Sequence, residues 1–136
     1  MKKLDNFINC LTILANADFK MAETNDIYRT GVIGQFNLTF ELAWKALQEI
    51  MRKHGVEDSS TGSPREILQL GYKFGFIDDS ETLLLMLKKL NTSVHIYNEE
   101  EVDELILLIR DSFIPAFTAL KDTLARKLDE AESNWE

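Results

Sequence analysis

ETNDIYRTGVIGQFNLTFELAWKALQEIMRKHG, residues 23–55, carries the amphipathic pattern on which the fold depends. Thr24 or Asn25 can cap the start of a helix, and Gly55 can end it. Between them, apolar residues recur at helical spacing: Val32, Ile33, Phe36, Phe40, Ala43, Trp44, Leu47 and Met51. The pattern predicts a single helix roughly 40 Å long, at about 1.5 Å per residue.

Helical patterns also precede and follow this stretch. An apolar stripe predicts a first helix that ends near Phe19, and its members are Leu4, Phe7, Ile8, Leu11 and Ala15. A short helix follows the long one, because Ser63 and Glu66 form a capping box around Pro64 and Gly75 suits a C-terminal stop. Asp78 and Glu81 then offer a capping pair for a helix through SETLLLMLKKL.

The last helix is predicted to begin at Asn98, which precedes three glutamates that favour the positive end of the helix dipole. Its stripe consists of Val102, Leu105, Ile106, Ile109, Phe113, Phe117, Leu120, Leu124 and Leu128. Pro115 interrupts the backbone hydrogen bonds of this helix, so we expect a kink there.

These patterns predict an all-α protein with four limbs, the third of which is broken into two short helices. An antiparallel up-and-down four-helix bundle is the simplest arrangement that buries every stripe. We expect one domain over residues 1–130 and a flexible tail over residues 131–136. The apolar run Leu83–Leu87 fits either a central core helix or a subunit interface, and both interpretations remain open.

Composition excludes several classes of function. The formal charge of −8 disfavours non-specific binding of nucleic acid, and the apolar runs are too short to cross a bilayer. The single cysteine, Cys10, indicates an intracellular thiol packed as a small hydrophobe, and we expect a cytoplasmic protein. The sequence lacks a Gly-rich phosphate loop and the CxxC, HExxH and GxSxG motifs. His54 and His95 are the only histidines, so no metal site is predicted.

LNTSVHIYNEEE, Leu90–Glu101, is the stretch that helix packing does not explain. In an extended backbone Val94 and Ile96 point to one side, and His95 and Tyr97 point to the other. Such a pair can transfer protons near neutral pH, or the phenol can itself be modified. Alternatively, His95 and Tyr97 are two buried rings that hydrogen-bond to neighbouring helix ends. Spacing alone favours this second interpretation.

Three stretches together resemble the nucleotidyltransferase substrate-binding proteins, which are related to the wider HEPN superfamily: YRTGVIGQFNLTFELAWKAL, SPREILQLGYKFGFIDD and NTSVHIY. The resemblance extends from about Phe7 to Leu124. It implies a homodimeric helical bundle that associates with a separate minimal nucleotidyltransferase encoded nearby. The implied cofactors, ATP and magnesium, belong to that partner, and none is expected on this chain.

The resemblance also implies roles for individual residues. In related toxin–antitoxin pairs the helical protein is a ribonuclease with an arginine, a histidine and a tyrosine in its motif, and the nucleotidyltransferase silences it by transferring AMP to the tyrosine. The histidine matches His95 and the tyrosine matches Tyr97. Leu90 stands where the arginine is expected, and Lys89 beside it lacks the planar fork with which arginine binds phosphate. Asn91 remains available to bind a substrate.

Polar positions of the long helix also match the family stretch: Arg29, Gln35, Glu41 and Lys45. Glu41 and Lys45 are four residues apart and alternatively form an exposed ion pair. Arg29, near a helix start where a cation is unfavourable, is the better candidate for an interaction, and Lys89 is a further one.

The sequence therefore predicts a non-catalytic partner subunit that presents a substrate or its own Tyr97 to a nucleotidyltransferase. One alternative is a HEPN-like ribonuclease toxin in which His95 transfers protons and Lys89 or Asn91 replaces the arginine. Another is a structural adaptor in which His95 and Tyr97 only fasten the fold.

Overall fold

The computed structural model describes residues 1–93 and 98–133, with side chains described for residues 1–90 and 98–133. Every regular element in these ranges is helical, which confirms the all-α prediction. The elements are α1 (Lys2–Ala15), α2 (Phe19–Thr24), α3 (Asp26–Lys53), α4 (Pro64–Lys73), α5 (Ser80–Ser93), α6 (Glu99–Leu108), the π-helical turn η1 (Ile109–Phe113) and α7 (Ile114–Ser133).

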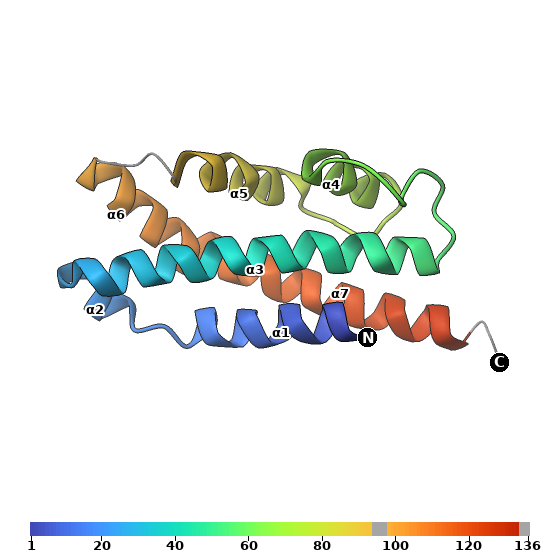
Figure 1. Ribbon diagram of the computed structural model, residues 1–136, viewed down its shortest axis with the longest axis horizontal. Coiled ribbons are helices and arrows are strands. Elements are labelled where there is room, and N and C mark those ends of the chain that lie inside the picture. Colours follow the sequence, from blue (N-terminus) through green and yellow to red (C-terminus); the bar gives the residue numbers. More distant parts are fainter. Residues whose placement is uncertain (94–97, 134–136) are drawn as a thin grey trace.

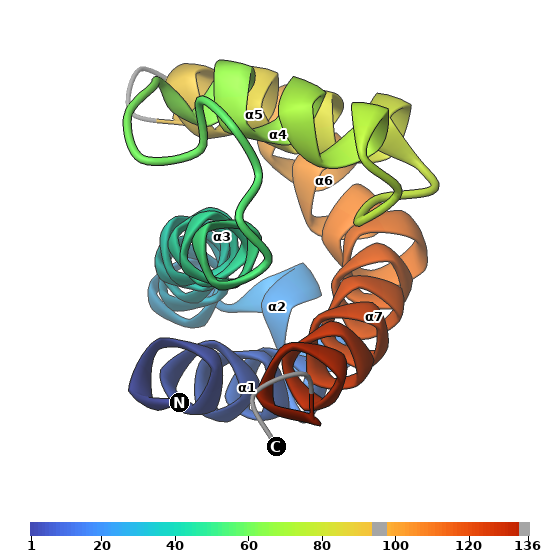
Figure 2. The same ribbon diagram turned by 90° about the vertical axis from the view of Figure 1, so that its right-hand side faces the viewer.

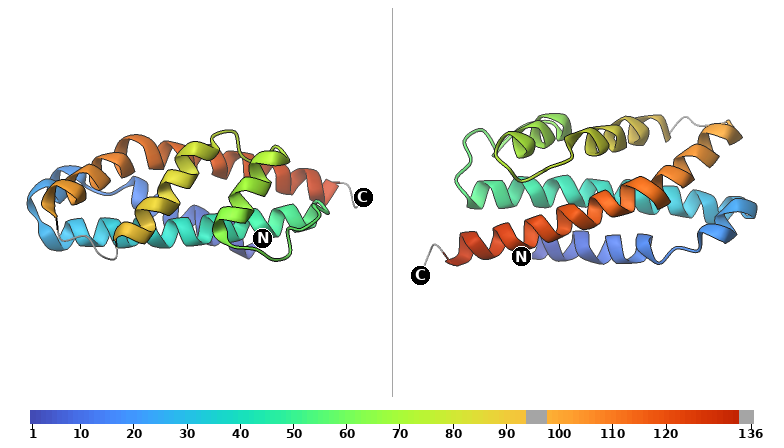
Figure 3. Two further views of the ribbon diagram at one scale, coloured as in Figure 1. Left: turned by 90° about the horizontal axis from the view of Figure 1, so that it is seen from above. Right: turned by 180° about the vertical axis from the view of Figure 1, so that it is seen from behind.

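Helix α3 spans the length of the molecule, and the other limbs lie around it (Figure 1). Helix α1 packs along one side of α3, and α4 and α5 follow each other along another side (Figure 2). The last limb consists of α6, η1 and α7. Its helix α7 packs against both α1 and α3, and α6 also contacts α3. Figure 3 shows from above and from behind that successive limbs run in opposite directions.

Aromatic side chains from three limbs form the centre of the core. Phe36 of α3 stacks on Phe113 of η1, with ring centroids 5.2 Å apart, and lies 6.2 Å from Phe117 of α7. Phe7 of α1 meets Phe117 edge-on at 5.9 Å. All four side chains are fully buried. The predicted apolar stripes of α3 and of the last limb therefore face the core.

The predicted end of the first helix, near Phe19, is wrong. Helix α1 stops at Ala15, which is exposed, whereas the neighbouring Leu14 is buried. A separate helix, α2, begins at Phe19 because the carboxylate of Asp18 accepts a hydrogen bond from the backbone N–H of Met21 at 3.0 Å. The apolar pattern continues past Asp18 to Phe19, so the pattern alone did not predict the break between α1 and α2.

Side-chain caps fix most of the other helix starts. Asn25 accepts from Tyr28 N–H at 2.8 Å at the start of α3, and the predicted capping box of Ser63 and Glu66 is present at the start of α4. The predicted cap at Asp78 is wrong. Asp79, one residue later, accepts from the backbone N–H of Thr82 at 2.9 Å. A carboxylate must directly precede the helix to reach this N–H group, and α5 begins at Ser80.

The last limb is interrupted, as Pro115 predicted, but the interruption is a π-helical turn rather than a simple kink. Pro115 has no N–H group, and its ring crowds the carbonyl four residues earlier. The preceding residues, Ile109–Phe113, form wider π-type hydrogen bonds instead. Helix α7 then continues to Ser133 and buries Ala131. It thus extends three residues into the predicted tail, and residues 134–136 lie outside the described residues.

Candidate functional site

The predicted polar site falls largely outside the described residues. His95 and Tyr97 belong to residues 94–97, and the side chain of Asn91 is also outside the described part. The flanks of this stretch are described: α5 leads into it, and Asn98 follows it as the cap of α6, accepting from Glu100 N–H at 2.8 Å. The candidate site is therefore described from the residues that contact the start of α6 and the end of α5.

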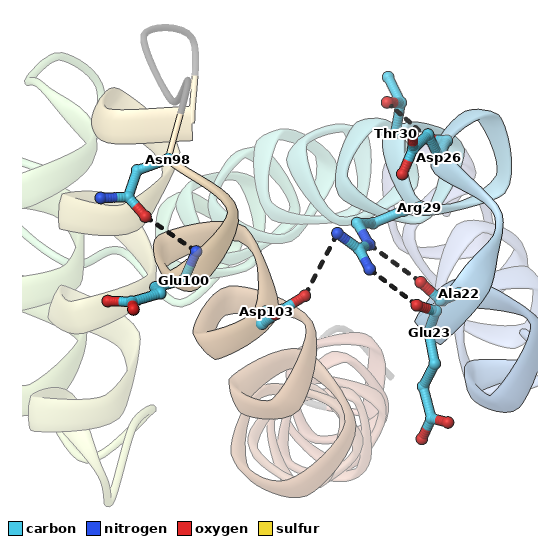
Figure 4. Close-up of polar contacts among 8 residues, drawn as sticks. All are labelled: Ala22, Glu23, Asp26, Arg29, Thr30, Asn98, Glu100 and Asp103. Carbon is cyan, nitrogen blue, oxygen red and sulfur yellow. Dashed lines mark hydrogen bonds and ion pairs between the residues drawn. The ribbon is translucent and has the colours of Figure 1, made fainter.

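Arg29 connects three helices at this end of the molecule (Figure 4). Its Nε donates to the carbonyl oxygen of Ala22 at 2.9 Å, and its Nη2 donates to that of Glu23 at 2.9 Å. Its Nη1 lies 3.2 Å from a carboxylate oxygen of Asp103 in α6. Arg29 thereby ties α2 and α6 to α3.

The partners explain why a cation is stable near the start of α3. Ala22 and Glu23 lie in the last turn of α2, where free carbonyl groups carry the negative end of the helix dipole. The Arg29 side chain is only 11% exposed, whereas that of Asp103 is 59% exposed. In the described structure the donors of Arg29 thus serve partners within the chain, and Asp103 faces solvent.

Lys89 forms a second link to α6. Its Nζ lies 3.7 Å from a carboxylate oxygen of Glu104, the neighbour of Asp103. Lys89 and Arg29, from different helices, therefore both reach the first turns of α6. Leu90, at the position of the expected arginine, packs against the core. The sequence interpretation missed Asp103 and Glu104 because the acidic start of α6 was explained by the helix dipole alone.

Glu41, Trp44 and Lys45 form a separate cluster on α3. The Glu41 carboxylate accepts from the indole N–H of Trp44 at 3.0 Å and pairs with Lys45 Nζ at 3.0 Å. Partial burial raises the pKa of Glu41, but the hydrogen bonds from Trp44 and Lys45 and the Lys45 charge outweigh it, and the pKa is lowered overall. Trp44 is only half-buried, so this cluster borders the surface.

Gln35 fastens α3 to α1, because its side-chain amide donates to the carbonyl oxygen of Cys10 at 3.1 Å. Cys10 itself is a free thiol and is half-buried. The candidate interaction residues are thus divided among three places: Gln35 at the α1–α3 contact, Glu41 and Lys45 on α3, and Arg29 and Lys89 beside α6.

His54 closes the opposite end of α3. Its Nε2 donates to the carbonyl oxygen of Lys127 in α7 at 2.6 Å, and its ring meets Phe76 edge-on at 5.2 Å. The Lys127 ammonium lies 5.1 Å from the centre of the same Phe76 ring. His54 is the C-cap residue of α3, and the helix therefore ends directly before Gly55, the predicted stop.

Two negative findings apply to residues 1–93 and 98–133. In that part of the chain no three histidine, cysteine, aspartate or glutamate side chains gather in a way that would hold a metal ion. No described helix combines the length and the apolar character needed to cross a membrane.

Comparison with known proteins identifies the family. Residues 2–126 match the family described as nucleotidyltransferase substrate binding protein like. The chain belongs to this family. It is also similar to a chain in a crystal structure of the toxin–antitoxin pair MntA–HpeT, solved as a tyrosine-to-alanine mutant. The two chains are 17% identical, with a TM-score of 0.72 over 92% of this chain and 96% of that one, and so share a fold. A search of curated proteins gave no match.

Proposed function

We propose that this chain is the non-catalytic, substrate-binding subunit of a two-component minimal nucleotidyltransferase. It presents either a bound substrate or its own Tyr97 to the catalytic subunit, which brings ATP and Mg²⁺. In this proposal the chain acts in the cytoplasm as a homodimer of up-and-down four-helix bundles. The family match over residues 2–126 is the observation that carries the proposal.

The surroundings of residues 94–97 support a presenting role. The start of α6 is held by the Asn98 cap, by the Arg29–Asp103 pair at 3.2 Å and by the Lys89–Glu104 pair at 3.7 Å. Lys89 also lies near the end of α5, on the other side of the segment. Anchored flanks restrict where an acceptor group can lie. Holding an acceptor close to a bound nucleotide removes much of the entropic barrier to transfer.

Transfer to Tyr97 would require little chemistry from this chain. The phenol oxygen attacks the α-phosphorus of ATP, and an oxygen–phosphorus bond forms as the bond to the β-phosphate oxygen breaks. Pyrophosphate leaves, and the phenol proton passes to a base or to solvent. The catalytic subunit and its Mg²⁺ stabilise the charge on the phosphates. This chain contributes the nucleophile and its position.

A HEPN-like ribonuclease remains the second candidate, because the similar solved chain comes from a toxin–antitoxin pair. His95 would transfer protons, and Lys89 or Asn91 would bind the phosphate in place of the arginine. Lys89 is a weak substitute, because its charge is partly neutralised by Glu104 at 3.7 Å and an ammonium cannot bind phosphate through a planar fork. The net charge of −8 also opposes RNA binding.

The direct experiment incubates the purified chain with the neighbouring nucleotidyltransferase, ATP and Mg²⁺, and follows the intact mass of this chain. A gain of one AMP, absent in Tyr97→Phe, would establish Tyr97 as the acceptor. Complex formation without any mass gain would leave a bound substrate as the acceptor. Absence of complex formation, together with RNA cleavage by the chain alone that His95→Ala abolishes, would replace the proposal with the ribonuclease.

The matched control is Tyr72→Phe, since Tyr72 is exposed on α4 and belongs to none of the candidate sites. This variant should gain AMP as the unmodified sequence does. If Tyr97→Phe changed only the stability of the chain and left the activity of the complex intact, the structural adaptor would be the correct interpretation.

A further inference from the structure

An apolar groove between α1 and α3 is unused by the proposed function. It has a volume of about 400 Å³ and is lined by Ile13, Leu14, Asn16, Ala17, Ile27, Tyr28, Gly31, Val32 and Gln35. None of these residues is charged, although 28% of the chain is. Ile27 is 87% exposed and Ile13 is 61% exposed, so large apolar side chains stand open to water at its rim.

Two glycines continue this surface along α3. Gly31 and Gly34 lie on the same side of the helix as Ile27 and Leu38, because spacings of four, three and four residues keep all four within roughly one-sixth of a turn. A Cβ atom added at either glycine would meet nothing within 4 Å, so packing inside the chain does not require them. Glycine is unfavourable inside a helix, and a close approach from outside the chain would explain both.

The order of these residues is symmetric. The midpoint lies between Val32 and Ile33. Ile27 and Leu38 form one pair at equal distances on either side of it, and Gly31 and Gly34 form a second, closer pair. In an antiparallel pair of α3 helices related by a two-fold axis at this midpoint, Ile27 of one copy faces Leu38 of the other. The glycines then face each other where the helices cross. Self-complementarity of this kind is what a two-fold interface requires.

The lack of charge in the groove is compatible with a second copy as the occupant. Two chains that each carry a formal charge of −8 repel each other, and contact through an uncharged surface brings no further like charges together. The groove provides such a surface. At its far end along α3, Glu41 and Lys45 are already paired with each other at 3.0 Å and leave little net charge.

We propose that this face, defined as Ile13, Ile27, Gly31, Gly34 and Leu38, is the homodimer interface, with the α3 helices of two copies crossing antiparallel at the glycines. The proposal rests on the homodimer of the proposed function and specifies its contact face. It does not depend on the nucleotidyltransferase, so the two can fail separately.

The first test measures self-association of the full chain alone by sedimentation velocity over a dilution series. The unmodified chain should dimerise, and Ile27→Glu should weaken the dimer at least about tenfold, because the new carboxylate would lose water opposite the apolar Leu38 of the other copy. Tyr72→Glu is the matched control, because Tyr72 is 56% exposed on α4, on another side of α3. A monomeric unmodified chain, or an unchanged Ile27→Glu dimer, would overturn the proposal.

Gly31→Ala separates association from folding. The added methyl group meets no side chain or neighbouring element within 4 Å, so urea unfolding at low protein concentration should show equal or greater stability. The same methyl group should hold the crossing helices apart and weaken the dimer. If Gly31→Ala left the dimer affinity unchanged, the close crossing at the glycines would be wrong.

Cross-linking tests the antiparallel register. In a Cys10→Ala background, a mixture of Ile27→Cys and Leu38→Cys chains should be joined by a short bis-maleimide, and each variant alone should not. Efficient cross-linking of Ile27→Cys alone would indicate a parallel pair and contradict the register. If Ile27→Glu abolished nucleotidyltransferase binding but not self-association, the face would belong to that partner and the proposal would be wrong.

Discussion

The two ends of α3 are both joined to the last limb, but by different chemistry. At one end Arg29 donates to two carbonyl groups of α2 and pairs with the exposed Asp103 of α6. At the other end His54 donates to the backbone of α7 at 2.6 Å and packs edge-on against Phe76. The Arg29 end depends on a permanent charge and holds α6, the helix that follows residues 94–97 in the chain, whereas the His54 end is held by one hydrogen bond and by packing on Phe76.

This difference suggests a division of roles between the ends. The His54 end closes the fold with a single hydrogen bond from His54 and with contacts of the His54 ring and the Lys127 ammonium to Phe76. The Arg29 end holds the start of α6, the element that follows the predicted site. Disruption at either end should lower stability, but only disruption at the Arg29 end should also weaken nucleotidyltransferase binding.

Arg29→Ala should have the largest effect on stability. It removes two charge-assisted hydrogen bonds to carbonyl groups and the pair with Asp103, and should lower the free energy of unfolding by about 3 kcal/mol. Urea unfolding measures this loss. Arg29→Lys should recover only part of it, because an ammonium cannot replace the fork that reaches Ala22 and Glu23 together. Full recovery by lysine would show that charge alone matters at this end.

His54→Ala should cost less, about 2 kcal/mol, because it removes one hydrogen bond and one edge-on aromatic contact. His54→Gln can still donate to the carbonyl of Lys127 and should recover part of the loss. If His54→Ala lowered nucleotidyltransferase binding as strongly as Arg29→Ala, the proposed division of roles between the ends would be incorrect.

Asn98→Ala should lower stability by about 1 kcal/mol, the usual cost of removing a side-chain N-cap. Amide hydrogen exchange should locate the loss in the first turn of α6, at the Glu100 N–H that Asn98 now binds. Asn98→Asp, which keeps an acceptor oxygen, is the control. Equal exchange in Asn98→Ala and the unmodified chain would mean that this cap does not hold α6.

The smallest effect should appear in acid. Hydrogen bonds from the hydroxyl and backbone N–H of Thr82 lower the pKa of Asp79 below its ordinary value of 3.8. A lowered folded-state pKa stabilises the protein above the unfolded-state pKa, and this contribution disappears as the pH falls through the folded-state pKa. The unmodified chain should therefore lose stability when the pH falls from neutral to below about 4. In Asp79→Asn the urea midpoint should fall less over the same pH change, because this carboxylate is absent.

Local signals in the sequence predicted much of the fold. The caps act within three residues, so spacing alone located those at Ser63 and Asn98 and limited the start of α3 to Thr24 or Asn25, of which Asn25 is the cap. The break before α2 was missed because Phe19 continues the apolar pattern beyond Asp18. The π-helical turn was also missed, since Pro115 predicts an interruption but not the hydrogen bonds that replace it.

The environment of the candidate site was much harder to predict. Arg29 was recognised as an unusual cation at a helix start, but its partner Asp103 lies far along the chain, and no spacing rule connects the two. The same applies to Lys89 with Glu104 and to His54 with Lys127. Asn91, His95 and Tyr97 remain predictions, because they fall outside the described side chains.

The proposed role as a partner subunit depends on association between this chain and its nucleotidyltransferase partner. Light scattering on a sizing column should give the mass of the chain alone and then of the mixture. A partner subunit should be a dimer alone and should form a larger complex of defined mass in the mixture, and Arg29→Ala should weaken that complex more than His54→Ala. A chain whose mass does not change when the nucleotidyltransferase is added at micromolar concentration would contradict the proposed role.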